Sequence, residues 1–421
     1  MQLNLAFDQL PGHCDVLVIG AGPAGSAAAR TLAQAGFDVV LVDQQAFPRD
    51  KVCGDGLIPD AHNALRKLGL LEAVHAQAQS ATAIRCIGPR GQGVDIPGTL
   101  SVIPRKQLDL IVCQAAVDAG ARMVAPARFV APIEELREGV ATVVGATLQQ
   151  GDAQREVRAP WVLLATGAVP QGLQAAGLCE RRTPSAIALR GYVRNRAMDA
   201  RITQLEVLWH PAIRSGYGWI FPCGDGLFNV GVGVMHSHAQ DAKQAKGRDM
   251  SAVNLREMLR TFERIHPPAQ ELIAGGVWEV EPKGAPLRCS LDGATYSRPG
   301  LIATGEAVGT TYALTGEGIG KALETGILAA EAVIEGRTAA LGEAEVRGAY
   351  EARVRALRPR YDVYSRANAV NSHPWLIDLL VWSARRSPSR LQRISAVLEE
   401  TYLPRDPLTV SGLMRLAFQR R

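Results

Sequence analysis

The stretch of residues 14–44, CDVLVIGAGPAGSAAARTLAQAGFDVVLVDQ, places the strongest constraint on how this chain can fold. Residues 15–19, DVLVI, are one acid followed by a continuous apolar run, which is typical of a strand buried on both faces of a parallel sheet. A glycine-rich turn, an alanine-rich helical segment and a second apolar strand, residues 37–42, follow in order. This strand–helix–strand order predicts a βαβ unit and an α/β fold.

The turn of this unit, GAGPAG, has the G-x-G-x-x-G spacing of a dinucleotide-binding loop. Gly20 permits the tight turn, Gly22 lets the backbone approach a pyrophosphate, and Gly25 lets the helix pack on the strand. The helix that follows directs its N-terminal N–H groups toward the phosphates. Asp43, 23 positions after Gly20, is placed to bind an adenosine ribose. The unit therefore predicts dinucleotide binding, either of FAD or of NAD(P).

Size and composition narrow the class of protein. With 421 residues, 47% of them hydrophobic, the chain can bury a large core in two or three domains. The net charge of +5, without a basic run interleaved with aromatic residues, argues against a nucleic-acid partner. The seven cysteines are odd in number and scattered, without a C-x-x-C pair, which predicts a reduced cytoplasmic setting, no disulfide framework and no zinc site.

Targeting segments are not expected. The first residues, MQLNLAFDQLPGHCD, lack the basic and apolar regions of a signal peptide, and no apolar run reaches the roughly 20 residues that span a bilayer. The basic, amphipathic C-terminal end has two interpretations, a core-packing helix or peripheral contact with a membrane surface. The membrane interpretation rests on Leu408, Val410, Leu413, Met414, Arg415, Leu416, Phe418, Arg420 and Arg421.

The remaining chain predicts three domains. Residues 80–103 and 122–165 show strand patterns, and the apolar strand that ends at Thr166 and Gly167 is expected to rejoin the first sheet. Residues 183–290 are rich in β-forming and aromatic residues, with a polar helical stretch at 238–264. We predict a Rossmann-type nucleotide-binding domain (1–182 and 291–340), an inserted antiparallel β substrate domain (183–290) and a helical C-terminal region (341–421), an α/β fold that is α+β overall.

Several motifs together resemble one family. They are KVCGDG at residues 51–56, YGWIFP at 217–222 with NVGVG at 229–233, and residues 301–318, which are similar to a second FAD motif. With the GAGPAG turn, they resemble the FAD-dependent oxidoreductases of the aromatic-hydroxylase superfamily, and within it the geranylgeranyl reductase branch. The resemblance implies FAD as the dinucleotide. Arg105, in the first turn of a helix at 104–119, matches an arginine near the flavin diphosphate in that superfamily.

The resemblance implies a set of cofactor-binding residues. Gly316 and Gly318, beside a helix N-terminus, would offer N–H groups to the flavin edge where negative charge develops on reduction. Ordinary loop geometry is the alternative for these glycines. The expected cofactor-binding residues are Gly20, Gly22, Pro23, Ala24, Gly25, Asp43, Gln44, Lys51, Cys53, Gly54, Arg105, Thr166, Gly167, Gly305, Glu306, Gly316, Gly318 and Ile319.

This sequence also departs from the family pattern. Glu306 replaces the aspartate that binds the ribityl chain, and Thr166 stands near the position of a hydroxylase acid. The usual lysine after the F-P pair is Cys223. No second nucleotide-binding unit is visible, so the external reductant, NAD(P)H or another donor, would bind transiently.

The substrate side is expected to consist of aromatic and small residues. We predict a pocket of Tyr217, Trp219, Phe221, Pro222, Asn229 and Gly231, with Cys53, Tyr217 and Trp219 as candidate catalytic residues. Packing in a sheet core is the alternative for the aromatic residues, and packing of a small thiol is the alternative for Cys53. His210, His236 and His238 have no spacing that supports a metal site, and no metal is expected.

Three functions compete at this point. The leading hypothesis is hydride transfer from reduced FAD to a carbon–carbon double bond of a small lipophilic, isoprenoid-like substrate. The alternative is a monooxygenase or halogenase that acts on an aromatic or carrier-bound substrate through a peroxyflavin. Its halogenase form is disfavoured because Tyr217 replaces the first tryptophan of the W-x-W-x-I-P motif. A flavin-binding structural or sensor protein is the third. The sequence contains no indication of the oligomeric state.

Overall fold

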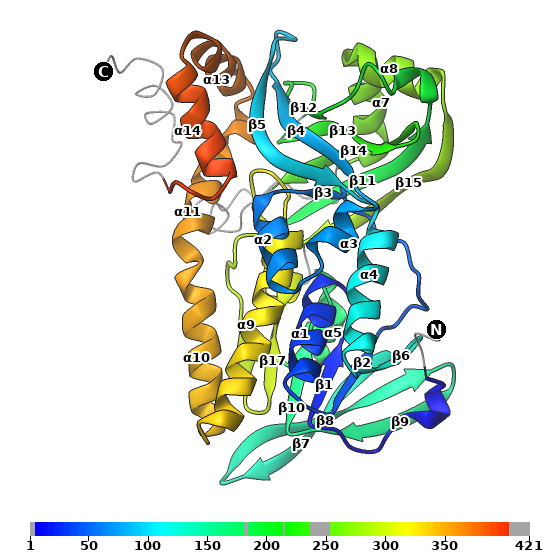
Figure 1. Ribbon diagram of the computed structural model, residues 1–421, viewed down its shortest axis with the longest axis vertical. Helices are drawn as coiled ribbons and strands as arrows, with labels where there is room; N and C mark the ends of the chain where they lie inside the picture. Colours follow the sequence, from blue (N-terminus) through cyan, green and yellow to red (C-terminus); the bar gives the residue numbers. More distant parts are fainter. Residues whose placement is uncertain (1–4, 181–183, 214, 236–252, 404–421) are drawn as a thin grey trace.

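A computed structural model describes residues 5–180, 184–213, 215–235 and 253–403 of the chain (Figure 1). A mainly parallel sheet lies in the lower half of the view, and a larger, mainly antiparallel sheet lies in the upper half. Helices run along one side from the lower half to the upper half (Figure 1). Residues from both halves line one cavity, which lies where the two sheets meet.

The parallel sheet has the strand order β16-β17-β10-β1-β2-β6. Strands β17, β10, β1, β2 and β6 are mutually parallel, and β16 pairs with β17 in the antiparallel sense at the edge. The residues of β1 and β2 are buried, as the continuous apolar runs predict for strands covered on both faces. The prediction of a βαβ unit in an α/β fold is confirmed. The strand bounds are β1 Val16–Ile19, β2 Val39–Val42, β6 Arg122–Val124, β10 Trp161–Leu164, β16 Ser297–Arg298 and β17 Leu301–Ala303.

Two helices with close backbone contact cover this sheet near the glycine turn. Helix α1 (Pro23–Gln34) packs on α9 (Ile319–Thr338), which returns to the first sheet almost 300 residues later in the chain. A Cβ atom at Gly326 would lie 2.1 Å from the carbonyl oxygen of Ala24, so the helices can approach this closely only because position 326 has no side chain. Other helices on this half are α2 (Pro59–Lys67), α3 (Leu71–His75), α4 (Arg105–Asp118) and α5 (Pro170–Ala175).

The larger sheet has the order β15-β11-β14-β13-β12-β4-β5-β3, with antiparallel pairing except between β12 and β4. Its bounds are β3 Gly56–Leu57, β4 Gln79–Ile87, β5 Gly93–Val102, β11 Ala186–Arg194, β12 Leu205–Leu208, β13 Gly216–Gly224, β14 Leu227–Met235 and β15 Val277–Leu287. Helices α7 (Leu255–Ile265) and α8 (Pro267–Ala274) cover one face of it. Residues 238–252 of the predicted helical stretch at 238–264 lie outside the described residues.

The assignment of residues 80–103 to the nucleotide-binding half is wrong at the level of the sheets. Strands β4 and β5 belong to the larger sheet, because β4 pairs in parallel with β12 in a register that places Ile84 opposite Leu205. Local sequence patterns identified these residues as strands but not their partner, which lies more than 100 positions later in the chain. The excursion that remains with the first half is the small sheet of β7 (Arg128–Arg137), β8 (Val140–Gln150) and β9 (Ala153–Arg158).

The C-terminal region is helical where the structure describes it. Helix α10 (Glu343–Ala356) packs on α9, and α11 (Arg358–Ala367) and α12 (Ala369–Ser372) lead to α13 (Trp375–Arg386) and α14 (Pro388–Leu398) beside the larger sheet (Figure 1). The apolar residues proposed for membrane contact, from Leu408 onward, lie outside the described residues. Within the described chain, no helix combines the length and the apolar character needed to cross a bilayer.

The contact between α1 and α9 generates a stability prediction. Gly326→Ala should destabilise the protein by about 1–3 kcal/mol, because the added methyl group must displace the α1 backbone. Gly348→Ala in α10 is the matched control, since a Cβ atom there would have no neighbour within 4 Å. That change should be neutral or stabilise by up to about 1 kcal/mol. Urea unfolding of both variants measures the difference, and equal midpoints would contradict the argument.

Candidate active site

The carboxyl ends of four neighbouring strands deliver the predicted cofactor residues to one edge of the parallel sheet. Glu306 follows β17, Thr166 follows β10, the GAGPAG turn follows β1 and Asp43 follows β2. The ladder continues briefly past the strands, since Ala165 N donates to the carbonyl oxygen of Ile19 at 2.8 Å. Ligands of open α/β sheets bind at this type of edge. The location is the one that the sequence predicts.

The three glycines of the turn lack a side chain for different structural reasons. Gly20 has φ +104°, and a Cβ atom there would lie 2.3 Å from the carbonyl oxygen of Ala165. A Cβ atom at Gly25 would lie 1.8 Å from the carbonyl oxygen of Gly20. Gly22 differs, because its nearest neighbour would be an Arg49 side-chain nitrogen at 3.6 Å. Packing within the protein requires Gly20 and Gly25, whereas the space beside Gly22 opens into a cavity.

Two arginines converge on the open side of Gly22. Arg49 Nη1 lies 3.1 Å from Asp109 Oδ2, and Arg49 Nη2 lies 3.3 Å from Asp43 Oδ2. Arg105 is buried and pairs with Asp109, with Nε 2.8 Å from Oδ1. This i,i+4 pair explains how a cation is stable in the first turn of α4. Arg49 is not among the predicted site residues, although its loop, with two cations just after the second strand, was expected to cross close to the cofactor.

Asp43 has the geometry of a fixed acceptor at the end of β2. Its Oδ2 accepts a hydrogen bond from Ala21 N at 2.9 Å and its Oδ1 accepts one from Gln45 N at 3.0 Å. These bonds hold the carboxylate against the glycine turn, where its remaining acceptor capacity faces the cavity lined by Asp43 and Gln44.

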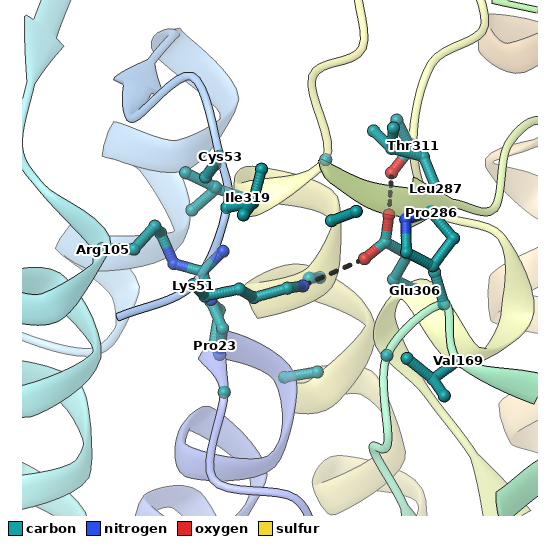
Figure 2. Close-up of a pocket in the computed structure, with 18 of the residues that line it drawn as sticks. Pro23, Lys51, Cys53, Arg105, Val169, Pro286, Leu287, Glu306, Thr311 and Ile319 are labelled. Atoms are coloured by element: carbon teal, nitrogen blue, oxygen red, sulfur yellow. Dashed lines mark hydrogen bonds and ion pairs between the residues drawn. The ribbon is translucent and has the colours of Figure 1, made fainter. Parts of the chain in front are cut away.

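On the other side of the turn, Lys51 extends across the cavity to Glu306 (Figure 2). Lys51 Nζ lies 3.1 Å from Glu306 Oε2, and Thr311 Oγ1 donates to Glu306 Oε1 at 3.0 Å. Both oxygens of this glutamate thus have protein partners. The longer side chain at position 306, compared with the family aspartate, is what reaches Lys51 and Thr311 together.

The segment of residues 51–56, here called the Cys53 loop, is held by the larger sheet. Arg190 on β11 is fully buried and donates to the carbonyl oxygens of Lys51 at 2.6 Å and Cys53 at 3.1 Å. It also pairs with Asp50 at 3.0 Å. Asn229 Nδ2 on β14 donates to the carbonyl oxygen of Cys53 at 2.8 Å. The larger sheet therefore binds the loop through its backbone carbonyl oxygens. The side chain of Cys53 is not needed for this binding and is half-buried.

Asp55, in the same loop, is a buried carboxyl with several donors. Arg105 N donates to Oδ1 at 3.2 Å, Asn229 Nδ2 donates to Oδ2 at 2.7 Å, and the Tyr192 hydroxyl donates to Oδ2. Burial raises the pKa of Asp55 to about 6, while Arg190 and the donors from Tyr192 and Asn229 act in the opposite direction. Arg190, Tyr192 and Asp55 join the Cys53 loop to both α4 and the larger sheet.

Aromatic side chains form one wall of the cavity, here called the aromatic wall: Trp209, Tyr217, Trp219 and Phe221. Successive ring centroids are 5.5, 6.1 and 6.4 Å apart, in tilted arrangements. The Tyr217 hydroxyl donates to the carbonyl oxygen of Thr315, and Trp209 Nε1 donates to Asn371 Oδ1 at 2.8 Å. Trp209 was missed as a site residue, because it follows β12 and is separate from the YGWIFP motif on β13.

Five predicted residues do not line the cavity. Gly25 lies within α1 and packs on the Gly20 carbonyl oxygen, and Gly305 packs against α1, where a Cβ atom at Gly305 would meet Ala24 Cβ at 2.6 Å. Pro222 points to the opposite face of β13, as the alternation along a strand requires. The Trp219 ring lies over Gly231. Trp219 Nε1 donates to Asn229 Oδ1 at 2.9 Å, and Asn229 Nδ2 donates to the carbonyl oxygen of Cys53. The prediction of Pro222, Asn229 and Gly231 as pocket residues is thus corrected: Asn229 and Gly231 support Trp219 from behind.

The other predicted residues line one continuous cavity of about 630 Å³ between the two sheets. Two polar atoms in its wall, Arg49 Nε and Thr166 Oγ1, are buried without a hydrogen-bond partner. These atoms, the open space beside Gly22 and the paired arginines fit an anionic dinucleotide such as FAD. The predicted residues in its wall are Gly20, Gly22, Pro23, Ala24, Asp43, Gln44, Lys51, Cys53, Gly54, Arg105, Thr166, Gly167, Tyr217, Trp219, Phe221, Glu306, Gly316, Gly318 and Ile319.

Comparison with known proteins bears on the same region. Residues 13–250, more than half of the chain, match the FAD binding domain family. The chain belongs to this family. It is an FAD-dependent oxidoreductase. The resemblance to the geranylgeranyl reductase branch, which the sequence motifs indicate, is confirmed by its relatives. It is 35% identical to the menaquinone reductase of Mycolicibacterium smegmatis over 342 residues, which cover 77% of each chain. It is 31% identical to digeranylgeranylglycerophospholipid reductase 1 of Methanopyrus kandleri, over 76% of this chain and 80% of that protein.

Solved structures show the same fold. A geranylgeranyl bacteriochlorophyll reductase-like protein from Thermoplasma acidophilum superposes with a TM-score of 0.71 at 21% identity, covering 96% of this chain and 95% of that one. A flavin-dependent brominase superposes with a TM-score of 0.72 at 20% identity, covering 96% of this chain and 98% of that one. At these identities the likeness concerns the fold of this flavoprotein and does not separate reductase from halogenase chemistry.

The contacts of Arg190 generate a prediction about the Cys53 loop. In Arg190→Lys a single ammonium group cannot replace the guanidinium fork, and the loss of donors to Lys51 and Cys53 should cost about 1–3 kcal/mol, chiefly at Lys51, because Asn229 still donates to the Cys53 carbonyl oxygen. Native-state labelling of Cys53 by a thiol reagent, located by peptide mass spectrometry, should become faster. Arg194→Lys, four residues along β11 and more exposed, should cost less than about 1 kcal/mol and leave labelling unchanged. Equal effects of the two variants would contradict the role of Arg190.

Proposed function

We propose that this enzyme uses FAD to reduce carbon–carbon double bonds in a lipophilic, isoprenoid-like substrate. The observation that supports it is that a single cavity has an anion-binding end at Gly22 and an aromatic end at Tyr217 and Trp219. A cofactor with a charged diphosphate and a flat redox ring needs both environments in one cavity. A lipophilic chain needs only the second.

On the cofactor side, the chain's own residues have distinct roles in this proposal. The N-terminus of α1 and the Gly22 backbone bind the diphosphate, with Arg49 and Arg105 behind it. Asp43 binds the adenosine ribose. Gly318, before the N-terminus of α9, places its N–H group at the flavin edge, whereas the Gly316 N–H donates to the carbonyl oxygen of Tyr312 at 2.9 Å and only shapes the turn. When bound, FAD supplies the hydride chemistry, and the protein supplies orientation and electrostatics.

On the substrate side, the aromatic wall excludes water and holds an apolar chain beside the cofactor. Tyr217 and Trp219 are buried, and both line the cavity. Cys53 lies on the opposing loop and is a candidate to contact the substrate. The relatives that support an isoprenoid-like substrate are those named menaquinone reductase and digeranylgeranylglycerophospholipid reductase.

The alternative is a monooxygenase or halogenase acting through oxygen. Its support is the fold shared with a flavin-dependent brominase. The relatives of higher identity carry reductase names, which favours reduction. The electron donor in our proposal is NAD(P)H or another reductant that binds transiently.

An anaerobic assay tests this proposal. The flavoprotein is reduced with NADPH, NADH or dithionite, and then mixed with a polyprenyl quinone or a digeranylgeranyl lipid without oxygen. We expect flavin absorbance to return and the lipid to gain two hydrogen atoms, detected by mass spectrometry. Reoxidation that requires oxygen, with substrate-dependent oxygen uptake, would instead support the monooxygenase alternative. Comparing the three reductants identifies the donor.

We further propose that the C-terminal region contacts a membrane surface, where a lipophilic substrate resides. The described part of this region supports it: Trp375 and Trp382, seven residues apart on α13, are 50% and 39% exposed. The guanidinium of Arg386 lies 4.4 Å from the ring centroid of Trp382, and Arg385 beside it is exposed. Exposed tryptophans next to arginines suit the interface of an anionic bilayer.

Vesicle flotation tests this contact. The protein should float with vesicles that contain anionic phospholipid, and the double variant Trp375→Ser, Trp382→Ser should lose most of this binding. The matched control is Leu136→Ser with Val277→Ser, which removes two exposed apolar side chains elsewhere, 79% and 71% exposed. Equal partitioning of the two double variants would remove the proposal. A chain that ends at residue 405 measures the share of the residues beyond α14.

A further inference from the structure

One acidic residue of the cavity, Glu317, has no part in binding the cofactor through the contacts of the turn or the Cys53 loop. Glu317 lies between Gly316 and Gly318, immediately before α9, and is one of the residues that line the cavity. A Cβ atom at Gly316 would lie 2.7 Å from the Tyr217 hydroxyl oxygen, so this turn is pressed against the aromatic wall. The Tyr217 hydroxyl also donates to the carbonyl oxygen of Thr315. Glu317 therefore lies where the predicted flavin edge and the aromatic wall meet.

The other carboxyl groups of the cavity are occupied by protein donors. Both oxygens of Glu306 have partners, in Lys51 and Thr311. Both oxygens of Asp55 likewise accept hydrogen bonds. Glu317 accepts one hydrogen bond, at Oε2 from Thr315 Oγ1 at 3.1 Å. No cation among the described residues acts to lower its pKa. Its second oxygen is thus available to a ligand.

The surroundings of Glu317 favour the protonated acid. Burial raises its pKa to about 8, with a further rise from Asp60 on α2 and from Glu400 after α14, and the Thr315 hydroxyl acts in the opposite direction. At neutral pH the side chain is therefore a carboxylic acid with a proton to give. The titratable groups of other elements that interact with it also include Tyr217, Cys86 and Tyr364.

We propose that Glu317 is a catalytic residue of this enzyme, the acid that delivers a proton to one carbon of the substrate double bond. This proposal rests on the reductase function proposed above. The alkene takes up a hydride from the reduced cofactor at one carbon and the Glu317 proton at the other. The π bond breaks and two C–H bonds form. The cofactor is left oxidised, Glu317 is left as a carboxylate, and solvent returns the proton.

The competing acids in the cavity are less suited. Burial raises the pKa of Tyr217 well above its ordinary value, and its hydroxyl proton is held by the Thr315 carbonyl oxygen. An acid is most effective when its pKa lies near the working pH, which holds for Glu317 and not for Tyr217. The carboxyl groups of Asp55 and Glu306 are held by the donors described above.

The first test follows the carboxyl group itself and does not depend on turnover. Infrared difference spectra of the oxidised flavoprotein, recorded from about pH 6 to about pH 10, should show a carboxylic acid that ionises with a midpoint near 8. Glu317→Gln should abolish this signal. Glu351→Gln is the control, because Glu351 is a partly buried carboxyl on α10 outside the cavity. A titration that survives in Glu317→Gln would overturn the proposal.

The second test follows proton delivery. In anaerobic single turnovers, Glu317→Gln should slow alkene-dependent reoxidation of the flavin by at least about 100-fold, while the rate of flavin reduction by the donor stays unchanged. In the wild-type protein this reoxidation should slow as the pH rises through the midpoint of Glu317. Glu317→Asp should retain part of the rate with a shifted pH profile.

The outcomes separate this proposal from the proposed function. If the wild-type protein does not reduce the alkene, both fall together. If the wild-type protein reduces it and Glu317→Gln does so equally fast, the reductase function stands and the acid role is refuted. If Glu317→Gln does not fold, Glu317→Asp decides, because an unchanged titration midpoint and pH profile in that variant would also refute the role.

Discussion

The position of the Cys53 loop between the two sheets depends on one buried arginine. Arg190 is fully buried, so its guanidinium needs hydrogen-bond acceptors and a counter-charge, and it finds them in the carbonyl oxygens of Lys51 and Cys53 and in Asp50. The loop in turn must lie where these acceptors meet the fork. Because the loop begins at the nucleotide-binding edge and β11 belongs to the larger sheet, this interaction joins the cofactor side of the cavity to the substrate side.

The same junction produces a gradient of polarity along the cavity. At the Gly22 end, Arg49 and Arg105 surround open space next to a helix N-terminus, which suits a diphosphate. At the other end, the aromatic wall suits an apolar chain. Glu317 lies where the two environments meet, and burial between them is the reason that its carboxyl group keeps a proton. The proposed reaction needs a redox ring, an alkene and a proton in one place, and the cavity is arranged for that combination.

Much of the nucleotide-binding edge could be predicted from sequence because its rules are local. Gly25 and Asp43 have their partners within one βαβ unit, and the spacing along the chain specifies the geometry. The errors arose where the partner is remote. Arg190 and Trp209 were missed because their partners lie in the Cys53 loop and in Asn371, far away in sequence. Residues 80–103 were included in the nucleotide-binding domain, although β4 and β5 pair within the larger sheet, for the same reason.

The sequence by itself determined the parallel-sheet unit, the dinucleotide site and the flavoprotein family, because near neighbours along the chain carry those signals. Only the tertiary structure decided which side chains share the cavity. It moved Asn229 and Gly231 from the pocket to a support behind Trp219, and it brought Glu317 to the aromatic wall. Burial, hydrogen-bond saturation and a raised pKa depend on groups that distant parts of the chain bring together, and a linear pattern does not contain those distances.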